Sequence, residues 1–223
     1  MPKVDLHFRV FGDDIPVDHG YHLFSSLSKL LAHVHDNDAL GVHSINGRLL
    51  GNRRMALTER SRLILRTPLE EVKSLIPLAG KSLRIGDSKI RVGVPHVRPL
   101  VPSSVLYSRL VVIKGFMAPD EFLAAVDRQL DRMGVQGVAS LVEQSRIAEL
   151  NRNRRGGTRS PFLRRTIRIR GKEVVGFAVV ISGLNEADSI LVQEEGIGGR
   201  RRFGCGIFIP YHRTTGGRSV MHR

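Results

Sequence analysis

Residues 196–210 read GIGGRRRFGCGIFIP, and this stretch carries more of the fold assignment than any other part of the chain. Its first eleven positions hold five glycines and three consecutive arginines. It is not a Walker loop, because Gly199 is followed by Arg200 and Arg201, and a dinucleotide fingerprint from Gly196 would need glycine at 201. It is therefore either an ordinary glycine turn or a loop where glycines let the backbone approach phosphate and arginines donate bidentate hydrogen bonds.

The charge balance of the chain favours a polyanionic partner. Lys and Arg total 35 against 21 Asp and Glu, which gives a formal net charge of +14. The arginines gather at 53–66, 152–170 and 200–202, within sequence that is otherwise able to fold. We therefore expect nucleic acid as the partner, ahead of an acidic protein or an anionic membrane.

Cysteine content and hydropathy predict a cytoplasmic protein. Cys205 is the single cysteine, so no intramolecular disulfide can form. The first ten residues, MPKVDLHFRV, have neither the apolar core nor the cleavage site of a signal peptide. Apolar runs such as 110–113 and 174–181 are under half a membrane span, so we expect no membrane anchor.

Hydrophobic periodicity predicts an α+β fold, beginning with one β-α-β-β-α-β unit. Alternation over 3–10 predicts a strand, and Asp18 is an N-cap candidate for a helix with apolar side chains at helical spacing up to Val34. The remaining elements expected here are strands at 41–45 and 61–66, a short helix at 69–78, and a strand with an internal turn at 82–93.

The same order of elements is expected again after a proline-rich segment. Pro95, Pro99 and Pro102 predict an extended linker at 96–104. The elements expected beyond it are a strand at 105–114, a helix at 118–133, strands at 164–170 and 174–181, a helix at 186–194 and a last strand at 203–209. We therefore expect two tandem ferredoxin-like (βαββαβ, RRM-like) domains, at 1–95 and 105–223.

The glycine spacing in the opening stretch resembles that of a known family. Gly196-Ile197-Gly198 is followed, after five residues, by Gly204-Cys205-Gly206. This is similar to the signature loop of the CRISPR repeat-processing endoribonucleases, the sixth Cas family, which lies between the last helix and the last strand of the second of two ferredoxin-like domains. Residues 189–193, the pair Ile207-Phe208 and the helix entry at 16–21 also resemble that family.

This resemblance implies metal-independent cleavage of a CRISPR precursor transcript within its repeats, which yields guide RNAs that the enzyme often retains. Without a metal, the 2′-hydroxyl of the repeat can attack the adjacent phosphorus while the protein orients the strand, moves protons and stabilises charge. No cofactor or metal is expected. The implied partners are repeat RNA, as precursor and as mature guide, and other Cas subunits of an effector complex.

Two histidines match the family's catalytic positions, which lie in the first helix or in the loops at its ends. His35 resembles the Leu-His ending of that helix, and His19 lies in the helix-entry motif. A continuous helix would separate them by about 24 Å, so we expect His35 to be catalytic and keep His19 as the second candidate. Ser28 stands where some relatives have a tyrosine partner, which leaves the second catalytic group open, and Lys29 either stabilises phosphorane charge or is a solvated side chain.

Two segments are expected to hold the RNA, through arginines and in a strongly salt-dependent way, because the chain has few aromatic residues. One is the glycine-rich loop, with Gly196, Gly198, Gly199, Arg200, Arg201, Arg202, Gly204 and Gly206. The other is the basic stretch 151–165, with Arg152, Arg154, Arg155, Arg159, Arg164 and Arg165. The alternative for the second segment is a basic loop without a defined role.

Two other functions stay open at this point. One is a catalytically inactive repeat-RNA-binding subunit of a CRISPR effector complex, which would have the same fold and the same RNA-binding segments. The other is a protein that binds double-stranded DNA, for which duplex DNA would compete equally with RNA.

Overall fold

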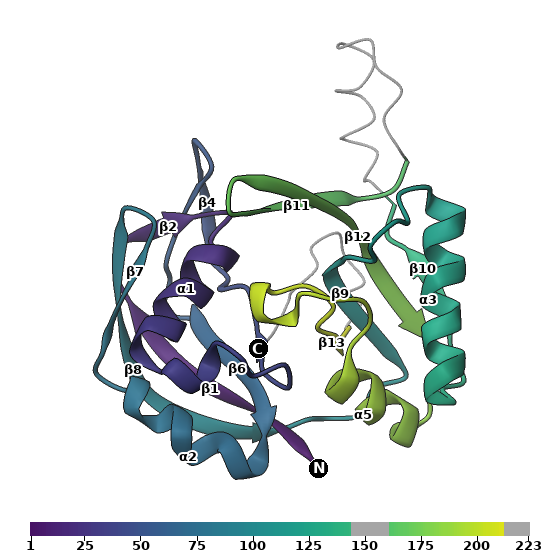
Figure 1. Ribbon diagram of the computed structural model, residues 1–223, viewed down its shortest axis with the longest axis horizontal. Helices are drawn as coiled ribbons and strands as arrows, with labels where there is room; N and C mark the ends of the chain where they lie inside the picture. The colour runs from purple at the N-terminus through teal and green to yellow at the C-terminus, as the bar shows by residue number, and fades with distance from the viewer. Residues whose placement is uncertain (144–160, 212–223) are drawn as a thin grey trace. The chain divides into compact units, whose positions relative to one another are not determined.

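The computed structural model describes residues 1–143 and 161–211, and in these ranges the fold is α+β (Figure 1). The chain forms two compact units. Unit 1 comprises residues 1–100, 167–174 and 200–205, and unit 2 comprises the described residues within 101–166, 175–199 and 206–223. Four of the predicted RNA-binding residues, Arg152, Arg154, Arg155 and Arg159, lie outside the described residues.

Unit 1 is built on a five-stranded antiparallel sheet with the strand order β3-β6-β1-β8-β7. Its strands are β1 (Lys3–Phe11), β3 (Gly41–Val42), β6 (Arg62–Pro68), β7 (Ser82–Ile85) and β8 (Ser88–Pro99). The alternation predicted for β1 is confirmed, since Val4, Leu6, Phe8 and Val10 are buried between more exposed neighbours. Leu6, Phe8 and Val10 pack in one core with side chains of α1 (Gly20–Leu30) and α2 (Val72–Leu75).

A second, three-stranded sheet in unit 1 was not predicted. Its strands are β2 (Asp14–Pro16), β4 (Arg48–Gly51) and β5 (Arg54–Ala56), in the order β2-β5-β4. The Arg54 guanidinium anchors it, because it donates to both Asp87 carboxylate oxygens at 2.9 Å, to Ser88 Oγ at 2.7 Å and to Asp14. Strands of three or four residues are too short to produce a hydrophobic period.

The first helix is shorter than the sequence predicts, and its N-cap is His19 rather than Asp18. It ends at Leu30 because Leu31 is extended, with φ −130° and ψ 93°. A 3₁₀ turn at Ala32–Val34 follows, and His35 comes directly after it. Hence His19 and His35 are not joined by one continuous helix, and the expected axial separation does not apply.

The prolines expected to form a linker lie partly within a strand. β8 includes Pro95 and Pro99 and pairs with β1 over this stretch, whereas β7 pairs with β8 only as far as Arg91. The far end of β8 is therefore an edge strand on one side, where a missing backbone N–H costs no ladder hydrogen bond.

Unit 2 contains a sheet with the strand order β10-β12-β9-β13, and β11 pairs with β12. Its strands are β9 (Val105–Val111), β10 (Val138–Leu141), β11 (Arg164–Ile169), β12 (Lys172–Ser182) and β13 (Ile209–Pro210). Its helices are α3 (Pro119–Met133) and α5 (Glu186–Glu195), both close to the predicted bounds. The predicted last strand is reduced to β13, because Arg201–Phe203 form a 3₁₀ turn.

Candidate functional site

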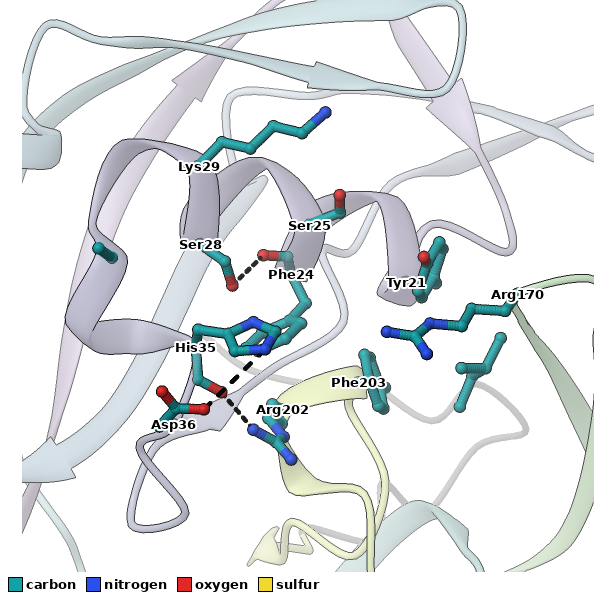
Figure 2. Close-up of a pocket in the computed structure, with 12 residues that line it drawn as sticks. Tyr21, Phe24, Ser25, Ser28, Lys29, His35, Asp36, Arg170, Arg202 and Phe203 are labelled. Atoms are coloured by element: carbon teal, nitrogen blue, oxygen red, sulfur yellow. Dashed lines mark hydrogen bonds and ion pairs between the residues drawn. The ribbon is translucent and has the colours of Figure 1, made fainter.

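A pocket of about 760 Å³ lies in unit 1 beside α1 (Figure 2). It is lined by α1 side chains between Tyr21 and Lys29, by His35 and Asp36, by Ile169 and Arg170 of the β11–β12 hairpin, and by Arg202 and Phe203 of the glycine-rich loop. Its volume is in the range typical of ligand-binding pockets. Three segments far apart in the sequence thus supply a histidine, several cations and several aromatic rings to one site.

His35 presents its imidazole to this pocket. Its side chain is 62% exposed, and its Nε2 lies 3.9 Å from Asp36 Oδ1. One face of the ring stacks on the buried ring of Phe24, with a centroid separation of 6.3 Å and an interplanar angle of 27°. The ring is therefore supported on one side and accessible to a ligand.

Arg202 joins the glycine-rich loop to the segment that carries His35. Its Nη1 donates to the backbone carbonyl of His35 (Figure 2). Its Nη2 lies 3.7 Å from Asp38 Oδ1. Its guanidinium also lies over the Phe24 ring, 5.4 Å from the centroid. Arg201 makes a related contact, since its Nη2 donates to the Asp38 carbonyl at 3.4 Å. Some of the guanidinium hydrogen-bond donors that we expected to bind RNA thus bind carbonyl groups of the protein itself.

Two close backbone approaches fix the 3₁₀ turn of the glycine-rich loop. A Cβ added to Gly20 would lie 2.5 Å from the carbonyl oxygen of Phe203, so the first turn of α1 can touch this loop only at a glycine. A Cβ added to Gly204, whose φ is +85°, would lie 2.8 Å from Ser44 Oγ. Between these contacts the Phe203 ring packs edge-on against Phe24, at 5.1 Å and 81°.

The amides of the predicted phosphate-binding glycines are engaged within the protein. In unit 2, Gly198 N donates to Gln129 Oε1 at 2.8 Å, and Gly199 N donates to the Val112 carbonyl at 3.0 Å. The N–H groups of Gly196, Gly204 and Gly206 likewise donate to backbone carbonyls. These glycines therefore supply backbone conformation and close packing, and their amides are not available to phosphate as the sequence led us to expect.

His19 does not line the pocket. It is 1% exposed, its Nδ1 lies 3.0 Å from the Pro16 carbonyl oxygen, and its Nε2 accepts a hydrogen bond from Ile45 N at 2.9 Å. These two contacts fit a neutral imidazole with its proton on Nδ1. His19 therefore ties the loop before α1 to the chain after β3.

Several predicted residues lie elsewhere in the molecule. Arg200 is exposed and has a left-handed backbone, with φ +70°. The Arg164 guanidinium lies over the Phe177 ring of unit 2, at 5.3 Å, and Arg165 Nε is buried without a hydrogen-bond partner. In the described ranges, no group of three or more His, Cys, Asp or Glu side chains could hold a metal ion. No helix among these residues is long and apolar enough to span a membrane.

Sequence reasoning missed the aromatic part of the pocket and one of its cations. The sequence indicates Tyr21 only as part of the helix entry, and it predicts a strand at Phe203. It also predicts Arg170 at a strand end, whereas its φ of +51° puts it in the hairpin turn with Gly171. The available signal was that Arg170 precedes the turn-forming Gly171. The sequence does not predict which part of the protein this turn contacts.

Comparison with known proteins gives consistent matches over nearly the whole chain. Residues 4–213 match the family model described as Cas6 Crispr. The CRISPR-associated endonuclease Cas6 of Myxococcus xanthus (strain DK1622) is 39% identical over 215 residues, which cover 96% of this chain and 84% of that protein.

Solved structures share the fold at low sequence identity. One, described as a Cas6-related gene product from Pyrococcus furiosus, has a TM-score of 0.62 and 13% identity and covers 92% of this chain and 97% of that one. Another, titled as a RAMP protein binding different RNA substrates, has a TM-score of 0.64 and 11% identity and covers 94% and 99%. A third, titled CRISPR associated protein Cas6, has a TM-score of 0.61 and 12% identity and covers 94% and 100%.

Proposed function

The chain belongs to the Cas6 family of CRISPR-associated, RNA-processing endonucleases, and from this we propose that it cleaves CRISPR precursor RNA within the repeats, without a metal ion, and remains bound to the guide RNA it releases. The observation that carries the proposal is the exposed imidazole of His35 in a pocket that also holds Lys29, Arg170 and Arg202. A proton-transfer group among cations suits a reaction in which charge develops on phosphate.

The reaction requires two proton transfers and charge stabilisation. The 2′-oxygen of one nucleotide forms a bond to the adjacent phosphorus as the bond to the 5′-oxygen of the next nucleotide breaks, which leaves a 2′,3′-cyclic phosphate and a 5′-hydroxyl. A base removes the 2′-hydroxyl proton, and an acid protonates the leaving 5′-oxygen. His35 carries out one of these transfers, because an imidazole can accept a proton on one ring nitrogen and donate one from the other.

The group that makes the other transfer is also sought in the pocket. Ser28 Oγ donates to the Phe24 carbonyl at 3.0 Å, which occupies its proton. The ammonium of Lys29 is the remaining candidate among the α1 side chains that line the pocket near Ser28. Lys29 can also neutralise the phosphorane, since its side chain is an exposed cation.

We assign the catalytic role to His35 rather than to His19. His19 is buried, and both of its ring nitrogens face backbone groups, so it has no path to a phosphate in the pocket. The RNA would be held by Arg200, Arg201 and Arg202 together with the basic stretch that ends in Arg164 and Arg165. The arginines of this stretch outside the described residues are assigned to the RNA on charge alone.

We also propose that the chain consists of two tandem ferredoxin-like domains with a boundary in 96–104. The strand order β3-β6-β1-β8 supports this for unit 1, and β10-β12-β9-β13 supports it for unit 2. In each, the first and third strands of a βαββαβ unit are central and its second and fourth strands flank them.

Incubation of the protein with its cognate repeat RNA in excess EDTA tests the proposed function. We expect one cut per repeat, a 2′,3′-cyclic phosphate on the upstream product, and a product that stays bound on a native gel. RNA that is shifted on the gel but uncut would instead identify a binding subunit of an effector complex. Equal competition by duplex DNA would contradict RNA recognition altogether.

A further inference from the structure

The pocket has two ends of different chemistry. Ser28, His35 and Asp36 lie at one end, where the proposed function places the phosphate. Tyr21, Phe203 and Arg170 lie together at the other end (Figure 2). The reacting groups of RNA need only the first end, so the aromatic end requires an explanation of its own.

The aromatic end is rigid and partly open. The rings of Tyr21 and Phe203 have centroids 6.1 Å apart and planes inclined by 38°. Both side chains are only partly buried, so each ring keeps an accessible surface. The close approach of Gly20 and the edge-on contact with Phe24 hold Phe203 in place. Aromatic surfaces that are ordered before binding can stack on a planar group at low entropic cost.

Arg170 faces these rings from a different segment. It extends from the β11–β12 hairpin toward Tyr21 and Phe203 (Figure 2). The hairpin is anchored to the chain before α1, because Arg168 N donates to Asp18 Oδ2 at 2.9 Å. Within the described part of the chain, no hydrogen bond or ion pair engages the Arg170 guanidinium, so this planar cation is available to a ligand.

We propose that the aromatic end is a subsite for one unpaired nucleotide next to the scissile phosphate, whose base packs against Tyr21 and Phe203 on one side and Arg170 on the other. Aromatic rings and guanidinium planes are the groups on which proteins stack splayed RNA bases. The subsite rests on the proposed function, because it takes the phosphate at the His35 end as its neighbour.

Such a subsite would also affect the geometry of the reaction. In an A-form stem, stacked bases hold the 2′-oxygen away from the line that joins the phosphorus to the leaving 5′-oxygen. Withdrawal of one base from the stack frees the backbone to place these three atoms in line. The subsite should therefore contribute more to the cleavage rate than to RNA affinity.

Single-turnover cleavage of repeat RNA with an abasic ribonucleotide on either side of the cut tests the proposal. We expect one of the two abasic RNAs to be cut roughly 5- to 150-fold more slowly than intact RNA by the wild-type protein, as for the loss of one stacked base. Arg170→Ala and Tyr21→Ala should slow the cutting of intact RNA but not slow that of this abasic RNA further. Tyr21→Phe should restore the rate, because the ring and not the hydroxyl is required.

Arg168→Ala is the matched control, since Arg168 is an exposed arginine of the same hairpin that does not line the pocket. It should leave the ratio of intact to abasic rates unchanged. Equal rates on intact RNA and both abasic RNAs would overturn the subsite while leaving the proposed function intact. If the wild-type protein cuts none of them, the proposed function fails, and equal affinity for intact and abasic RNA would then overturn the subsite as well.

Discussion

The imidazole of His35 stacks on the ring of Phe24, and the Arg202 guanidinium lies over that same ring while it donates to the His35 carbonyl. A core aromatic residue of α1 thus connects the candidate catalytic group to an arginine that comes more than 160 residues later in the chain. The glycine-rich loop is therefore part of the support of His35 as well as a candidate RNA contact.

His35→Ala should lower the single-turnover cleavage rate by at least about 100-fold, because it removes a proton-transfer group. Affinity for repeat RNA should stay within about twofold, since His35 is assigned to proton transfer and the arginines are assigned to binding. Rate and affinity are measured on the same RNA by gel electrophoresis and filter binding. His33→Ala, which changes a nearby exposed histidine outside the pocket, should cut at the wild-type rate.

His19→Ala should reduce stability rather than chemistry. It leaves the Ile45 N–H without its acceptor in a buried position, which costs about 1–3 kcal/mol. Urea unfolding followed by circular dichroism measures the loss, and the folded fraction should still cut RNA. A His19→Ala protein with wild-type stability and no activity would move the catalytic assignment from His35 to His19.

Arg202→Ala should lower the cleavage rate more than the affinity for RNA, because it removes the contacts that hold the His35 segment. Arg202→Lys should recover little of that rate, since lysine cannot reproduce the planar contact with Phe24. Single-turnover rates and dissociation constants on the same RNA give the comparison. An equal loss in both quantities would make Arg202 a simple phosphate contact.

Arg200→Ala should weaken binding first, because this exposed arginine lies outside the pocket. Loss of one phosphate contact should weaken binding and reduce the slope of log affinity against log salt by about one. A salt titration of affinity for intact repeat RNA measures that slope. An unchanged slope would remove Arg200 from the RNA interface.

Gly20→Ala should displace the loop at Phe203, since the added carbon would lie 2.5 Å from a backbone oxygen. We expect a loss of about 1–3 kcal/mol in unfolding free energy, typical of overpacking, and slower cleavage. Differential scanning fluorimetry and cleavage assays report the two effects. Gly199→Ala is the control, because a Cβ at Gly199 would meet no atom within 4 Å.

Acid should destabilise unit 1 through Asp5 and His43. Burial raises the pKa of Asp5, but Arg66, whose Nε lies 2.8 Å away, and His43 outweigh burial, so this pKa falls well below its ordinary value of 3.8. Burial lowers the pKa of His43 below 6.5, with Asp5 opposing the shift. Both folded-state pKa values lie below the unfolded-state values, so these two groups contribute fully to the free energy of unfolding above about pH 6.5. Their contribution declines as the pH falls, because the unfolded chain then binds more protons than the folded one.

Urea unfolding at pH values between 7.5 and 4 measures this decline. His43→Gln should flatten the part that begins below pH 6.5, whereas His33→Gln, at an exposed position, should leave the profile unchanged. The same slope in the wild-type and His43→Gln proteins would assign the acid sensitivity to other groups.

The long elements could be predicted from the sequence because their periodicity is local. β1 and α3 begin and end within one or two residues of the predicted bounds. The short strands β2, β4 and β5 contain too few residues to show a period, and their pairing depends on contacts such as those of Arg54. The strand across Pro95 and Pro99 depends on an edge that only the sheet order creates.

The site could be predicted only in part, for a related reason. The sequence predicts His35 near the end of the first helix, and in the structure it follows the 3₁₀ turn after α1 and lines the pocket, while its catalytic role stays a prediction. The neighbours of His35 were not predictable, because Arg170 and Phe203 reach the pocket through the folding of distant segments. Arg202 donates to a backbone carbonyl, and so do amides of the loop glycines. These contacts depend on residues that are distant in the sequence, so no local pattern predicts them.

Unit 1 is discontinuous in the sequence, because it includes residues 167–174 and 200–205 as well as 1–100. A fragment that stopped at Leu100 would retain His35 yet lose every pocket residue that comes from the second half of the chain. Exchange of N-terminal halves between relatives should therefore produce mismatched pockets even when each half folds. Recombination and protein engineering therefore have to take His35, Arg170 of the β11–β12 hairpin and Arg202 of the 3₁₀ turn from the same parent protein.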